Sequence, residues 1–228
     1  MDGFSFPVEV LKTNRKKSLS IRVDGPNVQV RAPKSISDNR IKKLLEKRTP
    51  WIKAKLEDYK RRPQSNNYRY VNGEIFKYLG RSYQLKLSIA DLQSVKLHKG
   101  KLWVNLNKND LHDSSTIKKL LEGWYQSHAQ DYLAKKTLQI SRQLGKNPSS
   151  ISVKNYKSRW GSCSSSGALT YNWRIIKAPI KIIEYIVVHE LCHLIEHNHS
   201  PKYWKNVEKH IPLWKEHRSW LKDNGSSL

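Results

Sequence analysis

Two histidines and a glutamate constrain the fold of this chain more than any other feature. The segment His189-Glu190-Leu191-Cys192-His193 has the H-E-x-x-H pattern of zinc hydrolases. On an α-helix, positions i and i+4 lie one turn apart on one face, so both imidazoles can direct a nitrogen toward the same tetrahedral zinc ion. Glu190 lies about 100° further round the helix axis, and we expect it to act as general base on a water at the metal. The pattern therefore predicts a rigid helix in the core.

The residues before this motif favour such a helix. Pro179 stands where a first helical turn tolerates proline, and no helix-breaking residue follows it before His189. An apolar stripe that would bury the helix is formed by Ile182, Ile183, Ile186 and Val187. The many β-branched residues also permit a buried strand, but the length of the stretch favours a helix.

A catalytic zinc requires a third protein ligand, and His199 is the best candidate. Asn198 tolerates the left-handed conformation that ends a helix, and Ser200-Pro201 is typical of the cap and first residue of the next one. The chain would then turn sharply and bring His199 back to the metal. His197 is the alternative ligand, but it can still belong to the first helix and point away from the metal face. We expect the other histidines to be surface or hydrogen-bonded core residues, namely His98, His112, His128, His210 and His217.

The spacing of the three histidines also matches that of the metzincin proteases. Two differences argue against that group. Position 196, where metzincins carry glycine, is Glu196, and the only methionine is Met1, so no Met-turn can lie beneath the metal. A different zincin lineage is indicated.

Further segments identify that lineage by resemblance. They are Arg159-Trp160-Gly161-Ser162-Cys163-Ser164, Tyr171-Asn172-Trp173-Arg174, residues 187–194, Asn198-His199-Ser200 and Tyr203-Trp204. Together they resemble the YgjP-like metallopeptidase domain family, which is related to the SprT-like and Spartan-type zincins. The resemblance is dense over residues 154–204. It is looser upstream, at Arg31-Ala32-Pro33, Gly73-Glu74 and Tyr78-Leu79-Gly80-Arg81.

The resemblance implies one zinc ion on His189, His193 and His199, the same ligands that the spacing indicates. Glu190 would again be the general base. It also implies that residues 159–174 form a wall of the cleft; we expect a β-hairpin there, turning at residues 164–167, whose edge strand could align a peptide. The alternative is an ordinary core hairpin with Trp160 and Trp173 as packing. Candidate substrate-binding residues are Arg159, Tyr171, Asn172 and Arg174. Candidates to stabilise the oxyanion are Tyr171, Asn172, Arg174 and Tyr203.

The charge of the chain indicates polyanionic partners. It has 43 Lys and Arg against 19 Asp and Glu, a net charge of +24, and residues 1–62 alone carry 17 basic and 7 acidic side chains. Nucleic acid is the first expected partner, bound mostly without sequence preference because no helix-turn-helix, zinc-finger or RNA-recognition signature is present. Any single basic cluster could equally be a solvated helix face. The candidate DNA-binding residues are Lys16, Lys17, Lys43, Lys47, Arg48, Arg61 and Arg62.

We predict an α+β fold in two regions. Residues 1–62 would form a basic β-hairpin and helix, and residues 68–228 a zincin-like (gluzincin or SprT-like) catalytic domain on which the first region packs. The hairpin would turn at residues 24–27, and a helix would run from Ser37 or Asp38 to about Tyr59 unless Pro50 divides it. Strands are expected near 75–89 and 95–106, a long helix near 114–143, and two short helices separated near Pro212. A polar stretch at 62–67 is the expected linker.

Cysteine content and hydropathy indicate a reducing, soluble setting. Cys163 and Cys192 form no disulfide framework and have no metal-ligand spacing to another cysteine, so Cys192 is expected to be a buried free thiol. No signal peptide or membrane-spanning stretch is evident. We therefore predict a cytoplasmic protein without membrane contact.

Three functions fit these observations. The first is a zinc metallopeptidase acting by a metal-activated water, with proteins held on nucleic acid as candidate substrates. The second is a metal-dependent nucleoside triphosphate phosphohydrolase, for which Arg159 and Arg174 would suit phosphate oxygens although a single zinc is unusual for that chemistry. The third is a nucleic-acid-binding protein with a non-catalytic metal site, against which the intact Glu190 argues.

Overall fold

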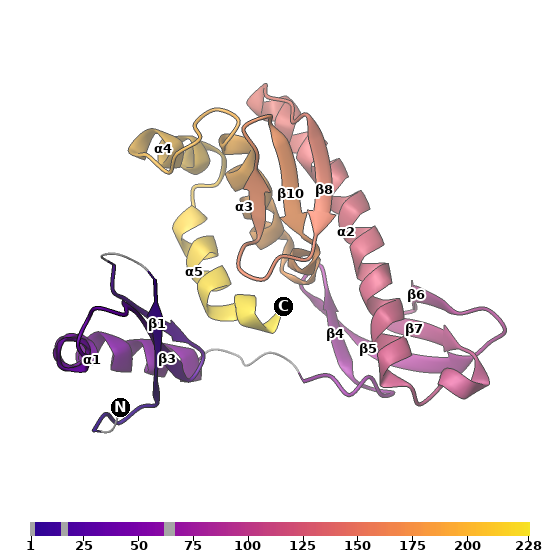
Figure 1. Ribbon diagram of the computed structural model, residues 1–228. Coiled ribbons are helices and arrows are strands. Elements are labelled where there is room, and N and C mark those ends of the chain that lie inside the picture. Colours follow the sequence, from indigo (N-terminus) through magenta and orange to yellow (C-terminus); the bar gives the residue numbers. More distant parts are fainter. Residues whose placement is uncertain (1–2, 15–17, 62–66) are drawn as a thin grey trace. The chain divides into compact units, whose positions relative to one another are not determined.

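The computed structural model describes residues 3–14, 18–61 and 67–228, and the chain divides into two compact units, Met1–Gln64 and Ser65–Leu228 (Figure 1). The expected linker at 62–67 lies almost wholly outside the described residues. Among these residues, no helix is both long and apolar enough to cross a membrane.

The first unit is a three-stranded sheet with one helix. Strand β3 (Asn27–Pro33) lies in the centre, parallel to β1 (Val8–Thr13) and antiparallel to β2 (Ser20–Asp24). Helix α1 (Asp38–Arg61) shares a core with this sheet, formed by Val28, Val30, Ala32, Ile41, Leu45 and Ile52. The hairpin and helix are as expected, and α1 continues through Pro50 without a break. Strand β1 was not predicted, because its partner β3 is about twenty residues away and a parallel pair leaves no local turn signal.

The second unit begins with a four-stranded sheet. Its order is β4 (Ile75–Tyr78), β5 (Arg81–Ile89), β7 (Lys101–Leu106) and β6 (Ser94–His98), with β5 and β7 parallel. A short 3-10 turn (Lys108–Asp110) leads to the long helix α2 (Ser114–Leu144), which contacts β6 and β7. The α2 helix begins where Asp113 accepts from Ser115 N–H and ends at Gly145, whose φ of 65° favours glycine.

A second sheet and the C-terminal helices complete this unit. Strand β10 (Ala168–Asn172) is parallel to β8 (Ser150–Lys154) and antiparallel to β9 (Gly161–Cys163), so β8 and β9 are the two edge strands. After a 3-10 helix (Trp173–Lys177), α3 (Ile180–Cys192) contacts α2 and β9, and α4 (Pro201–His210) and α5 (Trp214–Asn224) both contact α3. A last 3-10 turn spans Gly225–Ser227.

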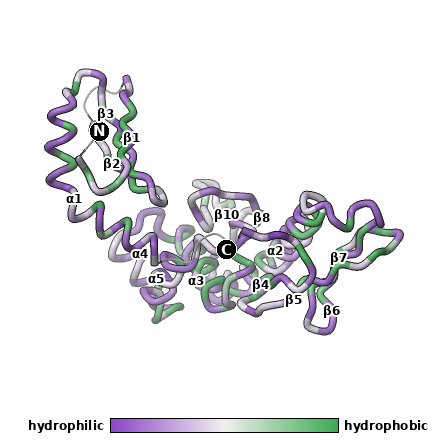
Figure 2. Tube along the Cα trace, turned by 90° about the horizontal axis from the view of Figure 1, so that it is seen from below, coloured by the Kyte–Doolittle hydropathy of each residue, from purple (hydrophilic) through white to green (hydrophobic). Residues whose placement is uncertain are grey.

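The α+β class is confirmed, and the helices differ in how they are buried. Helix α3 is mostly apolar and lies in the core, whereas α1 is mostly hydrophilic with apolar residues recurring along it (Figure 2). The buried residues of α3 include Ile182, Ile183, Ile186 and Val187, the predicted stripe. Burial on several sides holds the residues of the histidine motif in fixed positions.

Candidate metal centre

Helix α3 presents two of the three candidate ligands. His189 and His193 lie one turn apart with ring centroids 5.2 Å from each other, and Glu190 lies between them in sequence. The helix ends at His193, whose backbone N–H donates to the carbonyl oxygen of Glu190 at 3.2 Å. The helix expected for this motif is therefore present, and it places both imidazoles on one face.

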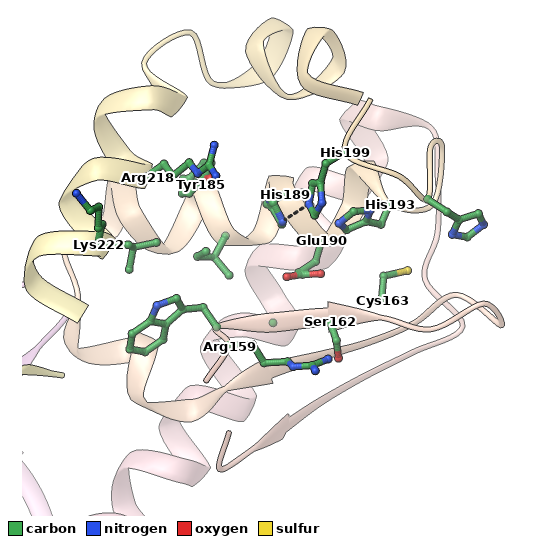
Figure 3. Close-up of a pocket in the computed structure, with 15 residues that line it drawn as sticks. Arg159, Ser162, Cys163, Tyr185, His189, Glu190, His193, His199, Arg218 and Lys222 are labelled. Carbon is green, nitrogen blue, oxygen red and sulfur yellow. Dashed lines mark hydrogen bonds between the residues drawn. The ribbon is translucent and has the colours of Figure 1, made fainter. Parts of the chain in front are cut away.

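The third histidine returns to the same point after a turn. The side chain of Ser200 accepts from the N–H of Tyr203, and Pro201 begins α4, as the cap signal predicted. The Nε2 atoms of His199 and His189 lie 3.1 Å apart (Figure 3). One ring nitrogen from each of His189, His193 and His199 lies within 4.8 Å of the others, whereas His197 lines the pocket outside this group.

These three side chains fit a tetrahedral metal ion. A zinc with bonds of about 2.0 Å to each nitrogen holds its ligand atoms roughly 3.3 Å apart, close to the separation of His189 and His199. Burial lowers the pKa of all three histidines, that of His189 to about 3. Lowered pKa values keep the rings neutral, which is the form that binds a metal.

Aromatic residues of α4 orient the histidines. Tyr203 is completely buried; its hydroxyl donates to the carbonyl oxygen of His189 at 2.8 Å, and its ring stacks on His193 with centroids 4.6 Å apart. Trp204 stacks on His199 at 5.5 Å and on Trp214 at 4.1 Å. Tyr203 is therefore a packing residue beneath the ligands, and its burial does not suit the predicted role at an oxyanion.

Glu190 lies against β9 at the base of the pocket. Its side chain is 4% exposed, and burial raises its pKa to about 8, while the Arg159 guanidinium acts in the opposite direction. A metal cation bound by the histidines would lower the pKa of Glu190, in the same direction as Arg159 does. A Cβ atom on Gly161 would lie 2.5 Å from Oε1 of Glu190, so only glycine lets the strand come this close. Sequence reasoning placed Gly161 in the family motif without this role.

A pocket of about 620 Å³ opens over the three histidines and Glu190. Strand β9 with Arg159 and Trp160 lines one side, and Arg218, Leu221 and Lys222 of α5 line another (Figure 3). Sequence reasoning did not single out Arg218 and Lys222. Their spacing of four residues on a helix was the available signal, but nothing in the sequence placed α5 beside α3.

Of the predicted substrate-binding residues, only Arg159 lines this pocket. Tyr171 is completely buried, and its hydroxyl accepts a hydrogen bond from Thr137. Asn172 is 4% exposed and donates to the carbonyl oxygens of Tyr156 and Arg159. Neighbouring residues of a strand point to opposite faces of the sheet, and both of these side chains are buried on the central strand β10. The motif that contains them supports the pocket wall instead of contacting a ligand.

Arg174 also lies outside the pocket lining. Its guanidinium lies 4.5 Å from the centre of the Trp173 ring, donates to Asn155 and approaches Glu122 at 3.9 Å. These contacts occupy the cation that was expected to meet substrate or phosphate. Of the cysteines, Cys192 is buried with a free thiol, and Cys163 is a half-buried free thiol in the pocket wall.

The candidate DNA-binding residues are only partly described. Lys43, Lys47 and Arg48 are exposed on α1. Lys16, Lys17 and Arg62 lie outside the described residues, as does the side chain of Arg61.

Comparison with known proteins agrees with the motifs. The sequence model of the YgjP-like metallopeptidase domain family matches residues 17–224, which confirms the resemblance found in the sequence. Two crystal structures of metallopeptidase zymogens are similar: abylysin of Pyrococcus abyssi (24% identity, TM-score 0.36, 40% of this chain and 93% of that one) and jannalysin of Methanocaldococcus jannaschii (22% identity, TM-score 0.36, 39% and 92%). No curated protein matches this sequence.

Proposed function

The chain belongs to the YgjP-like metallopeptidase domain family, and from this membership we propose that it is a zinc peptidase of the H-E-x-x-H type. That it is a metal-dependent peptidase follows from the family. The convergence of three imidazole nitrogens beside a buried glutamate supports zinc and supports its ligands, His189, His193 and His199. One ion fits this arrangement.

In the proposed mechanism, His189, His193 and His199 would hold a zinc ion, which would supply a Lewis acid to lower the pKa of a water and polarise the substrate carbonyl. Glu190 accepts a proton from that water and later donates it to the leaving amine. Its position is fixed by α3 on one side and by Gly161 on the other. A fixed carboxylate needs little reorganisation to transfer a proton in both directions.

Strand β9 is the proposed support for the peptide. It pairs with β10 along one edge, lines the pocket beside Glu190, and has no second partner strand in the described part of the chain. An extended peptide can pair with such an edge through backbone hydrogen bonds, which align it independently of sequence. The carbonyl group of the peptide bond to be cleaved would then lie next to Glu190.

Cleavage of a DNA-bound protein by the zinc-loaded enzyme tests the proposed function. Glu190→Gln is the control, and a nucleoside triphosphate is incubated in a parallel reaction. Peptide products that depend on Glu190 would support the peptidase. An intact protein substrate with Glu190-dependent phosphate release would favour the nucleotide phosphohydrolase, which the cations Arg159 and Arg218 at the pocket would suit. No product in either reaction would favour a nucleic-acid-binding protein with a non-catalytic metal.

We also propose that α1 holds the enzyme on nucleic acid. Its exposed cations are part of a chain with a net charge of +24, and phosphate contacts depend on such charges. Replacing Lys43, Lys47 and Arg48 by glutamine should reduce the slope of log affinity against log salt by about 3 for duplex DNA. The matched control replaces the exposed Lys96, Lys99 and Lys101 of the β6–β7 hairpin. Equal losses from both sets would contradict a role for α1.

A further inference from the structure

We infer that the pocket selects peptides with an acidic side chain next to the cleaved bond, and that Arg218 of α5 binds the carboxylate of that side chain. The inference deepens the proposed peptidase function and depends on it. It assigns a substrate class, acidic peptides, and a specificity residue, which the family membership alone does not supply.

The position of Arg218 places a cation at the edge of the metal centre. Arg218 lines the pocket, and its guanidinium carbon lies 5.3 Å from the centre of the Trp204 ring. Trp204 in turn stacks on the candidate ligand His199. The flat ring restricts the guanidinium at this point, which reduces the entropy that it loses when it binds a ligand.

The charges around Arg218 leave it without an acidic partner. Among the described residues that line the pocket, Glu190 is the only one with a carboxylate; it is buried on α3, and Arg159 is the cation that acts on it. Among the described residues, Arg218 forms no ion pair. On α5 itself, Asp223 accepts a hydrogen bond from Ser219. An arginine held close to a metal centre repels the metal ion, and an anion from the substrate would offset that repulsion.

The helix also carries a second cation toward the same pocket. Lys222 lies one turn after Arg218 and lines the pocket as well. Like charges at this spacing are unfavourable for a helix, so helix stability does not explain their placement. A carboxylate fits the guanidinium of Arg218 through two parallel hydrogen bonds. A peptide with Asp or Glu on the α5 side therefore meets a complementary surface.

The experiment compares peptides that differ only by Glu or Gln at one position, with that position moved across the cleaved bond. For the zinc-loaded protein we expect kcat/KM to favour Glu by about tenfold at one position. Arg218→Gln should bring the ratio close to one, and Arg218→Glu should make the enzyme prefer Lys over Gln there. Lys215→Gln is the matched control, because Lys215 lies on α5 and over the Trp214 ring but does not line the pocket. It should leave the ratio unchanged.

Each other outcome has a distinct meaning. A loss of kcat/KM in Arg218→Gln that is equal for Glu and Gln peptides would overturn the inference in favour of a general electrostatic role. If no peptide is cleaved at all, the proposed function fails. The inference is then tested by fluorescence anisotropy, as binding of the same peptides to zinc-loaded Glu190→Gln protein with and without Arg218→Gln. Binding of a nucleoside triphosphate that depends on Arg218, without any such dependence for peptides, would overturn it in favour of a phosphate ligand.

Discussion

Helix α3 and the segment that follows it supply the same candidate metal centre, but they hold their ligands by different means. In α3, backbone hydrogen bonds and burial on several sides fix His189 and Glu190. His199 is exposed and follows a turn, and the flat ring of Trp204 from α4 holds it. Helical spacing alone thus defines one half of the centre, and tertiary packing of aromatic rings defines the other.

The largest effect should come from a change that leaves both halves intact. Glu190→Gln keeps the volume of the side chain but removes the group that accepts the proton, so we expect kcat to fall by about 10³-fold. Zinc content and melting temperature should stay close to those of the wild type. An active Glu190→Gln protein with full zinc content would show that Glu190 is not the general base.

Removing one ligand from each half compares them directly. His193→Ala and His199→Ala should each reduce zinc affinity by more than about 100-fold, the upper range for residues that only support ligands. Their metal-free proteins should differ. His193→Ala removes a half-buried ring that stacks on the buried Tyr203 and should lower the melting temperature, whereas His199→Ala removes an exposed ring that contacts Tyr203 and Trp204 and should lower it less.

Equal melting temperatures for the two metal-free variants would show that His193 and His199 are held alike. Zinc titration against a competing chelator gives the affinities, and thermal unfolding with chelator present gives the stabilities. The two halves hold their ligands differently if the zinc affinities of both variants fall while their melting temperatures differ.

A change at the contact between α3 and β9 should have the next largest effect on activity. Gly161→Ala places a methyl group 2.5 Å from Oε1 of Glu190, so the carboxylate or the strand must move. Overpacking costs about 1–3 kcal/mol, and if this displaces the general base, kcat should fall about ten- to hundred-fold. Gly167→Ala strains the turn of the same hairpin, because Gly167 has a φ of +78°, but its Cβ would not meet Glu190; it therefore shows what a disturbed hairpin alone does to activity. Normal activity of Gly161→Ala would mean that Glu190 adapts freely.

The contrast between local signals and tertiary packing also explains which parts of the fold and the site could be predicted from the sequence. Helix α3, the hairpin of β9 and β10, and the turn before α4 follow from local signals: periodicity, a serine-rich turn, and the Ser200-Pro201 cap. Strands β1 and β8 were missed because each pairs in parallel with a distant strand. The motif containing Tyr171 and Asn172 suggested ligand contacts, but both side chains are buried on the central strand β10.

The residues that surround the ligands depend on how helices pack, and the sequence does not encode this locally. The sequence positions of Trp204, Trp214 and Arg218 are compatible with either a buried face or a pocket face for each residue. Only the packing of α4 and α5 on α3 brings Trp204 onto His199, and Trp214 and Arg218 against Trp204. The helix-borne half of the centre was therefore predictable in detail, and the supporting half only in outline.

The smallest effect should come from the ring that holds the exposed ligand. Trp204→Leu keeps an apolar side chain but removes the face that stacks on His199, so we expect zinc affinity to fall by about tenfold, the lower end for supporting residues. Trp220→Leu is the matched control, since Trp220 is also partly buried on the C-terminal helices but is not among the described aromatic residues whose rings contact the histidine ligands. Similar losses in both variants would indicate general loosening of these helices. A loss confined to Trp204→Leu would show that side-chain stacking does for His199 what the helix backbone does for His189.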